Sequence, residues 1–174
     1  MEQPEEPSRF DQVILPHLDA AYNLARWLTR NADDAQDVVQ EALIRALKYF
    51  AGYREGSARA WLLTIVRNAS YSWLQRRRGQ ETVPLYEEEP AHFPDEASNP
   101  EAQMLRRAHS QRVQQAVQEL PIEFREVIVL RELEGLSYKE ISAVAGVPVG
   151  TVMSRLARAR ERLQHSLAEL RSTR

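Results

Sequence analysis

Basic and hydroxyl-bearing side chains gather near the C-terminus in a pattern that suits contact with a DNA duplex. An arginine can donate two hydrogen bonds to O6 and N7 of guanine, and serine and threonine hydroxyls can reach bases or phosphates. A helix beginning near residue 149 would point one group of side chains outward: Thr151, Met153, Ser154, Arg155 and Arg158. We expect this group to read base edges in a major groove. An ordinary helical hairpin with a solvated basic face remains the alternative. Arg160 and Arg162 suit phosphate or solvent better.

The residues around this group have the capping and turn signals of a helix-turn-helix. Ser137 and Glu140 form a capping-box pair that opens a short helix. Gly146 allows a sharp turn before a second helix that begins near residue 149 or 150 and runs to about 171. Four apolar residues are spaced to pack the two helices together: Ile141, Val147, Val152 and Leu156.

A second candidate site lies on a helix expected from about Ser57 to Arg78. Thr64, Asn68, Tyr71 and Gln75 are spaced to share one polar face. Aromatic and basic residues lie near that face: Tyr53, Arg54, Arg59, Arg67, Arg76, Arg77 and Arg78. Aromatic and amide groups among arginines suit single-stranded nucleic acid, through stacking and base-edge hydrogen bonds. A solvated helix face with a basic end remains the simpler alternative.

A run of acidic and amide residues precedes that site, on a helix expected from about Asp33 to Phe50. Its members are Asp33, Asp34, Asp37, Gln40 and Glu41. Such a run is usually a solvated face. Capping alone explains the first two acids, because anions are favoured in the first turn of a helix.

The apolar periodicity of the chain predicts an all-α fold of two small helical domains. The N-terminal domain, residues 8–78, would hold three helices, the first spanning 8–30 with a break or kink at Pro16. Trp61, Ile65, Ala69 and Trp73 would face its core. The C-terminal domain, residues 104–174, would hold four helices: 104–119, 121–134, 137–145 and 149–171. Residues 79–103 are rich in Pro and acids and predict a flexible acidic linker.

Composition narrows the classes of function. The net charge is −2, which argues against a stand-alone DNA binder, although the acidic linker masks two basic patches. The chain lacks cysteine, a signal peptide and any apolar run that could span a bilayer, so a cytoplasmic protein without stable membrane insertion is expected. Its four histidines are scattered, and no phosphate-binding loop or nucleophile motif occurs, so we expect no enzyme, metal or cofactor.

Three segments together resemble the sigma factors of bacterial RNA polymerase. Residues 34–46 (DAQDVVQEALIRA) look like the helix by which sigma factors dock on the clamp helices of the largest polymerase subunit. Residues 59–68 (RAWLLTIVRN) resemble the promoter-melting helix that reads the −10 element. Residues 134–141 (EGLSYKEI) and 148–160 (PVGTVMSRLARAR) resemble the −35-reading domain. No third folded domain separates them, as in the small extracytoplasmic-function type.

The resemblance implies partners and residue roles. Core polymerase would be bound by Asp34, Asp37, Val38, Gln40, Glu41 and Leu43. Single-stranded −10 DNA would be bound by Tyr53, Arg54, Arg59, Asn68, Tyr71, Arg76 and Arg77. The duplex −35 element would be read by Thr151, Met153, Ser154, Arg155 and Arg158. An anti-sigma factor is the expected regulatory partner.

The chain departs from the family at three positions, and two rival functions stay open. Ser72 lies near a position often occupied by aspartate. Ser142 stands where alanine is usual, which implies a small packing change, and Met153 stands where a basic residue is frequent, which leaves the −35 preference open. A stand-alone helix-turn-helix regulator would bind its duplex tightly without polymerase. A helical protein–protein adaptor would not need Arg155 or Arg158.

Overall fold

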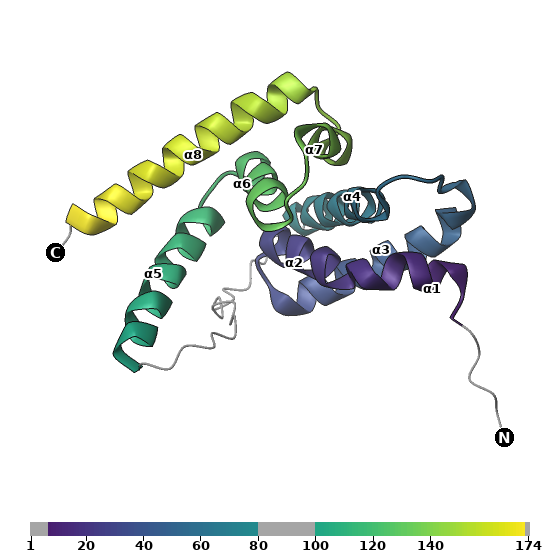
Figure 1. Cartoon of the computed structure of the whole chain (residues 1–174), viewed down its shortest axis with the longest axis horizontal. Coiled ribbons are helices and arrows are strands. Elements are labelled where there is room, and N and C mark those ends of the chain that lie inside the picture. Colours follow the sequence, from purple (N-terminus) through teal and green to yellow (C-terminus); the bar gives the residue numbers. More distant parts are fainter. Residues whose placement is uncertain (1–6, 80–99, 173–174) are drawn as a thin grey trace.

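The N-terminal half is a bundle of helices. The computed structural model describes residues 7–79 and 100–172, and every regular element within these ranges is helical. The α-helices of this half are α1 (Arg9–Ile14), α2 (Leu18–Thr29), α3 (Ala32–Tyr49) and α4 (Ala58–Arg78), with short 3₁₀ turns η1 (Leu15–His17) and η2 (Phe50–Gly52) (Figure 1). The predicted interruption at Pro16 is confirmed, because the 3₁₀ turn η1 separates α1 from α2 there.

Side-chain caps set the starts of these helices. The Ser8 hydroxyl accepts a hydrogen bond from the Asp11 amide at 3.1 Å, and the Asp11 carboxylate accepts one from the Ser8 amide at 3.2 Å. The Asn31 side chain accepts from the Asp34 amide, and the Ser57 hydroxyl accepts from the Ala60 amide. Each contact satisfies an amide that the first turn of a helix would otherwise leave unbonded.

The core of the N-terminal half differs from the predicted one on α4. The residues of α4 that are buried are Leu62, Leu63, Val66, Ala69 and Ser70. Trp61, Ile65 and Trp73 are only partly buried, at the rim of the core. These three therefore face the core as predicted, together with the buried Ala69, but the fully buried stripe of α4 also includes neighbouring positions that the every-fourth-residue repeat did not indicate.

The C-terminal half contains α5 (Pro100–Gln118), α6 (Ile122–Ile128), α7 (Tyr138–Ala145) and α8 (Val149–Ser172). A π-helical segment, η3 (Val129–Leu133), continues α6 and replaces the last turns of the single helix predicted over 121–134. Helix α5 begins four residues before the predicted 104, so residues 100–103 are helical and do not belong to a linker. Residues 80–99 of the predicted linker lie outside the described residues.

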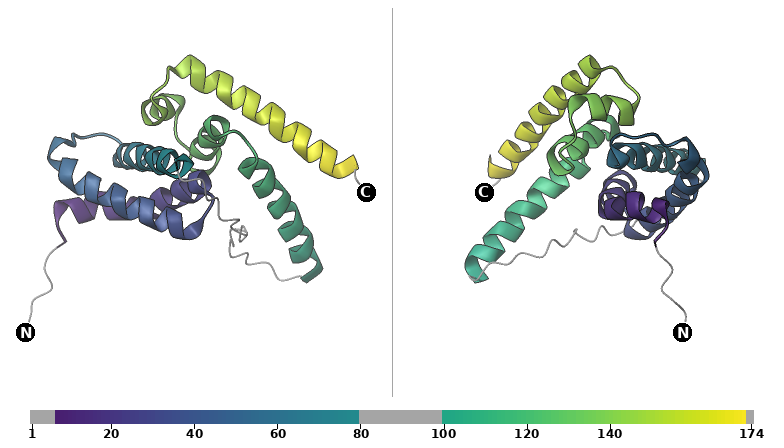
Figure 2. Two further views of the ribbon diagram at one scale, coloured as in Figure 1. Left: turned by 180° about the vertical axis from the view of Figure 1, so that it is seen from behind. Right: turned by 45° about the vertical axis from the view of Figure 1, so that its right-hand side comes forward.

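The two halves pack against each other. Helix α4 runs beside α7, and α2 lies beside α6, as both views in Figure 2 show. Arg125 of α6 is buried, and its Nη1 donates a hydrogen bond to the Trp27 carbonyl oxygen at 2.8 Å. That carbonyl belongs to the last turn of α2, where a cation is favoured by the helix dipole. The chain is thus closed, with its two halves in direct contact.

Candidate nucleic-acid and protein-binding surfaces

The helix-turn-helix forms as predicted, and Ser142 stabilises its turn. Gly146 ends α7 in the left-handed region at φ 67°, and its amide donates to the Ser142 carbonyl at 3.0 Å. The Ser142 hydroxyl donates to the carbonyl of Val147 on the far side of the turn. Ser142 therefore does more than the small packing change expected from the sequence, since its hydroxyl satisfies a carbonyl of the turn.

Packing of α7 against α8 determines which side of α8 is exposed. Ile141, Val152 and Leu156 are buried together, with Val147 partly buried beside them. On the other sides of α8, Met153 is 53% exposed, Ser154 and Arg158 are exposed, and Thr151 and Arg155 are partly exposed. Within residues 7–79 and 100–172, neither Arg155 nor Arg158 has an ion-pair partner. The predicted duplex-reading group is therefore available to a ligand.

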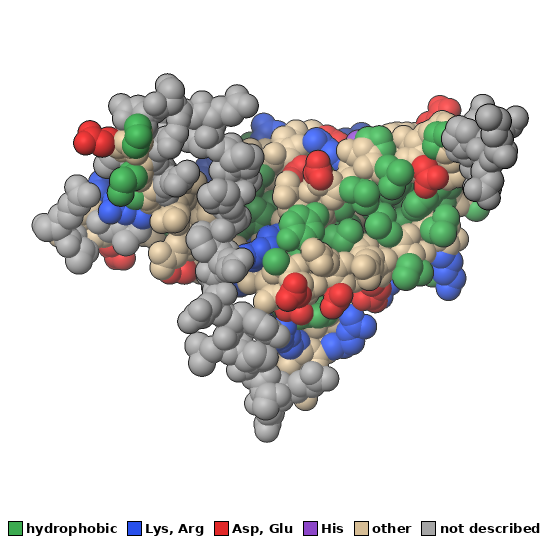
Figure 3. All heavy atoms as spheres, turned by 90° about the horizontal axis from the view of Figure 1, so that it is seen from below, with side chains coloured by type: hydrophobic (Ala, Val, Ile, Leu, Met, Phe, Trp, Pro, Cys, Tyr) green, Lys and Arg blue, Asp and Glu red, His purple; other side chains and the backbone are tan. Residues whose placement is uncertain are grey.

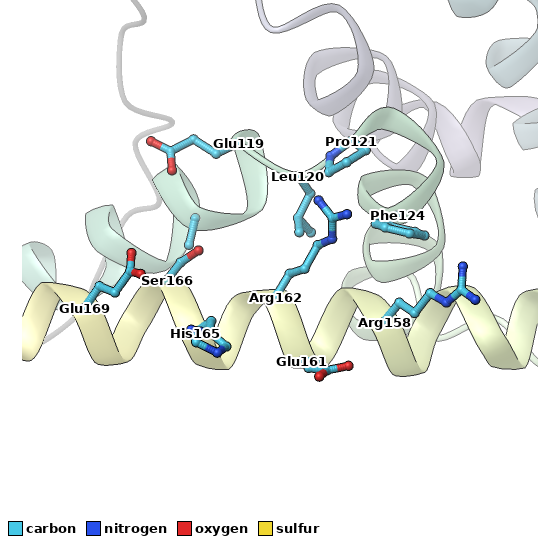
Figure 4. A pocket seen from close by; sticks show the side chains of 11 residues that line it. Glu119, Leu120, Pro121, Phe124, Arg158, Glu161, Arg162, His165, Ser166 and Glu169 are labelled. Atoms are coloured by element: carbon cyan, nitrogen blue, oxygen red, sulfur yellow. The ribbon is translucent and has the colours of Figure 1, made fainter.

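The two later arginines of α8 are bound within the C-terminal half. An Nη of Arg160 lies 2.9 Å from Oε1 of Glu132. Arg162 lies over the Phe124 ring, 5.1 Å from its centroid. Figure 4 shows Arg162 reaching toward Leu120 and Phe124 across a groove of about 670 Å³ between α8 and the α5–α6 turn. These contacts agree with the expectation that Arg160 and Arg162 do not read bases.

Helix α3 presents acids and apolar side chains on its exposed surface. Asp33, Asp37 and Gln40 are exposed, whereas Val38 is 0% exposed in the core. The Val38 side chain is therefore unable to touch a partner directly, contrary to the role that the resemblance implied. Leu43 is partly exposed.

Two of the acids on α3 pair with arginines at the end of α4. Asp34 Oδ2 lies 2.7 Å from an Nη of Arg77, and Glu41 Oε2 lies 3.1 Å from an Nη of Arg76. Glu41 also pairs with Arg45 at 2.6 Å. The sequence had placed the acids and the arginines in two separate sites. The structure brings them together, so part of each expected site is neutralised by the other.

An apolar patch lies on α3 beyond these ion pairs. Ile44 is 70% exposed and Leu47 is 61% exposed, and their spacing places them on one face with the partly exposed Leu43. Figure 3 shows hydrophobic side chains gathered on the surface of the N-terminal helices when the molecule is seen from below. Large exposed apolar patches commonly mark protein-interaction sites. Sequence reasoning left Ile44 out and placed Leu47 on the apolar side of this helix with the alanines, although a helical-wheel count places both Ile44 and Leu47 away from the buried alanines.

The loop before α4 is held by an aromatic cluster. The Tyr53 ring stacks on Phe50 with centroids 5.7 Å apart and also contacts Trp61 at 5.2 Å. The Tyr53 hydroxyl donates to the Gly56 carbonyl at 3.1 Å. Arg54 is exposed, and Arg59 is partly exposed. Tyr53 is therefore part of a packed platform, with Arg54 at its edge.

The centre of α4 faces the C-terminal half. Nε of Arg67 donates to Oε1 of Glu126 at 2.5 Å, and the Tyr71 hydroxyl donates to Oε2 of Glu126 at 2.9 Å. Arg67 also lies over the Tyr71 ring, 3.8 Å from the centroid. Burial, together with the nearby Glu126 carboxylate, raises the pKa of Tyr71 well above its ordinary value. Of the polar face predicted on α4, Asn68 and Gln75 are exposed and Thr64 is partly buried.

Sequence reasoning missed Glu126. Its carboxyl group is 0% exposed and has both oxygens bound by residues 55 and 59 positions away. A glutamate beside Arg125 on a helix reads as an ordinary surface charge. No local signal distinguishes it, because its partners come from the other half of the chain.

Among the described residues, no helix is both long and apolar enough to cross a membrane. The same part of the chain contains no group of three or more His, Asp or Glu side chains placed to hold a metal ion.

Two segments of the chain match known family models. Residues 13–80 match "Sigma-70 region 2", and residues 110–163 match "Sigma-70, region 4". The first match falls on the N-terminal half with α3 and α4, and the second on the half with the helix-turn-helix.

Several characterised proteins are similar over most of the chain. The "RNA polymerase sigma-H factor" of Pseudomonas aeruginosa is 36% identical, covering 92% of this chain and 87% of that protein. The "ECF RNA polymerase sigma-E factor" of Escherichia coli is 40% identical, covering 79% and 75%. The "ECF RNA polymerase sigma factor SigE" of Mycolicibacterium smegmatis is 38% identical over 92% of this chain, which spans 62% of the length of that relative.

Two solved structures have a similar fold. The sigma factor RpoE of Bartonella quintana, crystallised with the anti-sigma factor NepR, matches with a TM-score of 0.73 and 33% identity, covering 91% of this chain and 96% of that one. CnrH in complex with the cytosolic domain of CnrY matches with a TM-score of 0.63 and 27% identity, covering 92% and 88%.

Proposed function

The chain belongs to the extracytoplasmic-function group of RNA polymerase sigma factors in the sigma-70 family, and we propose that it binds core RNA polymerase and directs it to promoters. The observation that carries this proposal is the order of three features along the chain. A helix with exposed acidic and apolar side chains and a polar, basic helix lie within residues 13–80, and an exposed helix-turn-helix lies within residues 110–163.

The N-terminal half would dock on core polymerase through the exposed side of α3. The proposed contacts are Asp37 and Gln40, together with the apolar patch of Leu43, Ile44 and Leu47. Asp34 and Glu41 would contribute once released from Arg77 and Arg76. Burial of the apolar patch would supply affinity, and the acids would set the orientation.

The C-terminal half would place the duplex −35 element against α8. Arg155 and Arg158 suit the acceptor edge of guanine, and Thr151 and Ser154 suit bases or phosphates. Met153 is exposed and apolar, so it suits contact with a thymine methyl group. Arg160 and Arg162 would stay in their intramolecular contacts and support the domain.

Helix α4 and its preceding loop would hold unpaired −10 bases. Tyr71 offers a ring for stacking, Asn68 offers an amide for base edges, and Arg54 and Arg59 offer charge for the backbone. Trapping unpaired bases shifts the equilibrium from closed to open promoter, so binding energy melts the duplex without hydrolysis of a nucleotide. On this proposal the chain is a non-catalytic subunit that acts in the cytoplasm and needs no cofactor.

An anti-sigma factor would regulate the chain. The support is that both structurally similar proteins described above were solved in a complex, and the sigma factor of Bartonella quintana was solved with an anti-sigma factor.

Run-off transcription with core polymerase and a promoter library tests the proposal. We expect transcripts that depend on the added chain and share −35 and −10 sequences. Ile44→Asp should weaken binding to core polymerase, because a charge would enter a buried contact, whereas Gln164→Asp at an exposed site on α8 should not. If the purified chain did not bind core polymerase, but bound duplex DNA tightly without it, the chain would instead be a stand-alone regulator.

A further inference from the structure

We propose that Glu126 is an intramolecular latch that holds the C-terminal half over the nucleic-acid face of α4 in the free chain. The inference rests on the proposed function, because it concerns the same −10-binding face. It adds that this face is closed by the chain itself until the two halves separate.

The latch is a single carboxylate whose two oxygens serve two different donors. Oε1 accepts from Nε of Arg67 at 2.5 Å, and Oε2 accepts from the Tyr71 hydroxyl at 2.9 Å. Charge-assisted hydrogen bonds of this kind are stronger than neutral ones. The Glu126 side chain is fully buried, and that of Arg67 is 20% exposed, so water competes poorly for the contact.

The latch and the capture of a base exclude each other. A base stacked on Tyr71 needs a face of the ring, and Arg67 covers one face at 3.8 Å from the ring centroid in the closed chain. The Tyr71 hydroxyl is also occupied by Glu126. DNA would have to displace both contacts, and this displacement lowers the affinity of the closed chain for unpaired bases.

Other carboxylates of the C-terminal half face the start of α4. The charge of Arg59 acts on Glu134 and on Glu140. Burial raises the pKa of Glu134 and Arg59 opposes that shift, while the hydrogen bond from the Ser137 amide lowers the pKa of Glu140 with help from Arg59. Acids of one half therefore stand opposite Arg59 and Arg67, the cations that a DNA backbone would approach.

The closed arrangement masks one nucleic-acid face and leaves the other open. Met153, Ser154 and Arg158 remain exposed on α8 while Tyr71 is covered. Buried apolar side chains of both halves belong to one cluster, so the halves separate only when binding to other partners replaces the contact between them. Docking of α3 on a large partner, followed by −35 binding, would supply the free energy that opens the latch.

The test compares Glu126→Gln with Glu123→Gln, an exposed glutamate on the same helix. The chain contains no cysteine, so Lys48→Cys on α3 and Gln164→Cys on α8 can carry spin labels in the full-length protein. We expect Glu126→Gln to lengthen and broaden the distance between the labels, while Glu123→Gln leaves it unchanged. Unchanged distances in both variants would overturn the latch.

Binding of a single-stranded −10 oligonucleotide to the free chain is the second measurement. Glu126→Gln should tighten binding by roughly tenfold or more, the factor that corresponds to losing a charge-assisted hydrogen bond. Glu123→Gln should bind as the parent chain does. Equal affinities for all three chains would contradict the proposal.

If Glu126→Gln fails to fold, Tyr71→Phe tests the latch instead. This variant keeps the ring for stacking and removes only the hydroxyl that Glu126 binds. We expect the labels to move apart and the single strand to bind more tightly, whereas a tyrosine that serves only DNA would give no change in distance. Run-off transcription by the parent chain tests the proposed function separately, because the label distances report the latch whether or not transcription occurs.

Discussion

The exposed face of α8 and the central face of α4 carry similar side chains, yet they differ in what those side chains touch. On α8, Arg155 and Arg158 have no ion-pair partner among the residues that the structure describes. On α4, Arg67 and Tyr71 are bound to a buried carboxylate from the other half. An arginine count would treat the two faces alike. Their availability differs because one faces solvent and the other faces a second domain.

The buried side of α8 gives the largest expected effect. Leu156 is 1% exposed and joins α8 to α7. Leu156→Ala should lower the free energy of unfolding by about 3 kcal/mol, because it removes apolar contacts and leaves a cavity. Met153→Ala, at an exposed position on the same helix, should change stability by less than about 0.5 kcal/mol. Urea denaturation measures both, and equal losses would mean that the two sides of α8 are not distinct.

Promoter binding can distinguish the arginines of α8 that have no ion-pair partner among the described residues from the arginine that is held in an ion pair. Arg155→Ala and Arg158→Ala should each weaken binding to the preferred −35 sequence by about 1–3 kcal/mol and relax the preference at one base pair. Arg160→Ala should lose much less, since Arg160 is paired with Glu132. The measurement is holoenzyme binding to templates with single −35 substitutions at constant salt. If Arg160→Ala weakened promoter binding as much as Arg155→Ala does, Arg160 would also have to be counted among the residues that contact the −35 element.

The ion pairs between α3 and α4 should have smaller and unequal effects. Arg77→Ala should cost about 1 kcal/mol of stability, because Asp34 and Arg77 are both largely buried and 2.7 Å apart. Arg76→Ala should cost less than about 0.5 kcal/mol, because the Arg76 side chain is 60% exposed and solvent screens the pair. Thermal unfolding of both variants checks this. A greater loss for Arg76→Ala would show that exposure does not govern these pairs.

Alkaline titration of tyrosine gives the smallest effect. Burial beside Glu126 raises the pKa of Tyr71 above its ordinary value near 10. The neutral phenol is thus favoured in the closed chain, and its contribution to stability is complete below about pH 10 and is lost as the pH rises through the higher folded-state pKa. Ultraviolet absorbance should show one of the six tyrosines ionising late. That late fraction should vanish in Tyr71→Phe and move to lower pH in Glu126→Gln.

Local patterns in the sequence predicted most of the helices and the helix-turn-helix. The Ser137–Glu140 capping box, the Gly146 turn and the apolar positions of α8 are interactions among near neighbours, so their spacing alone indicates them. The break at Pro16 followed from the missing amide of proline. The π-helical segment η3 and the rim position of Trp61 and Trp73 did not follow from spacing, because packing between helices decides them.

The amino-acid sequence by itself determined most of the helices and the helix-turn-helix, because these depend on residues within one or two turns of each other, and the order of three motifs along the chain indicated the family. Only the tertiary structure decided which charges are occupied. Arg76 and Arg77 pair with acids 35 and 43 residues away, and Arg67 pairs with Glu126, 59 residues away. Such pairs form when distant segments meet, and electrostatic attraction acts through distance in space rather than along the chain.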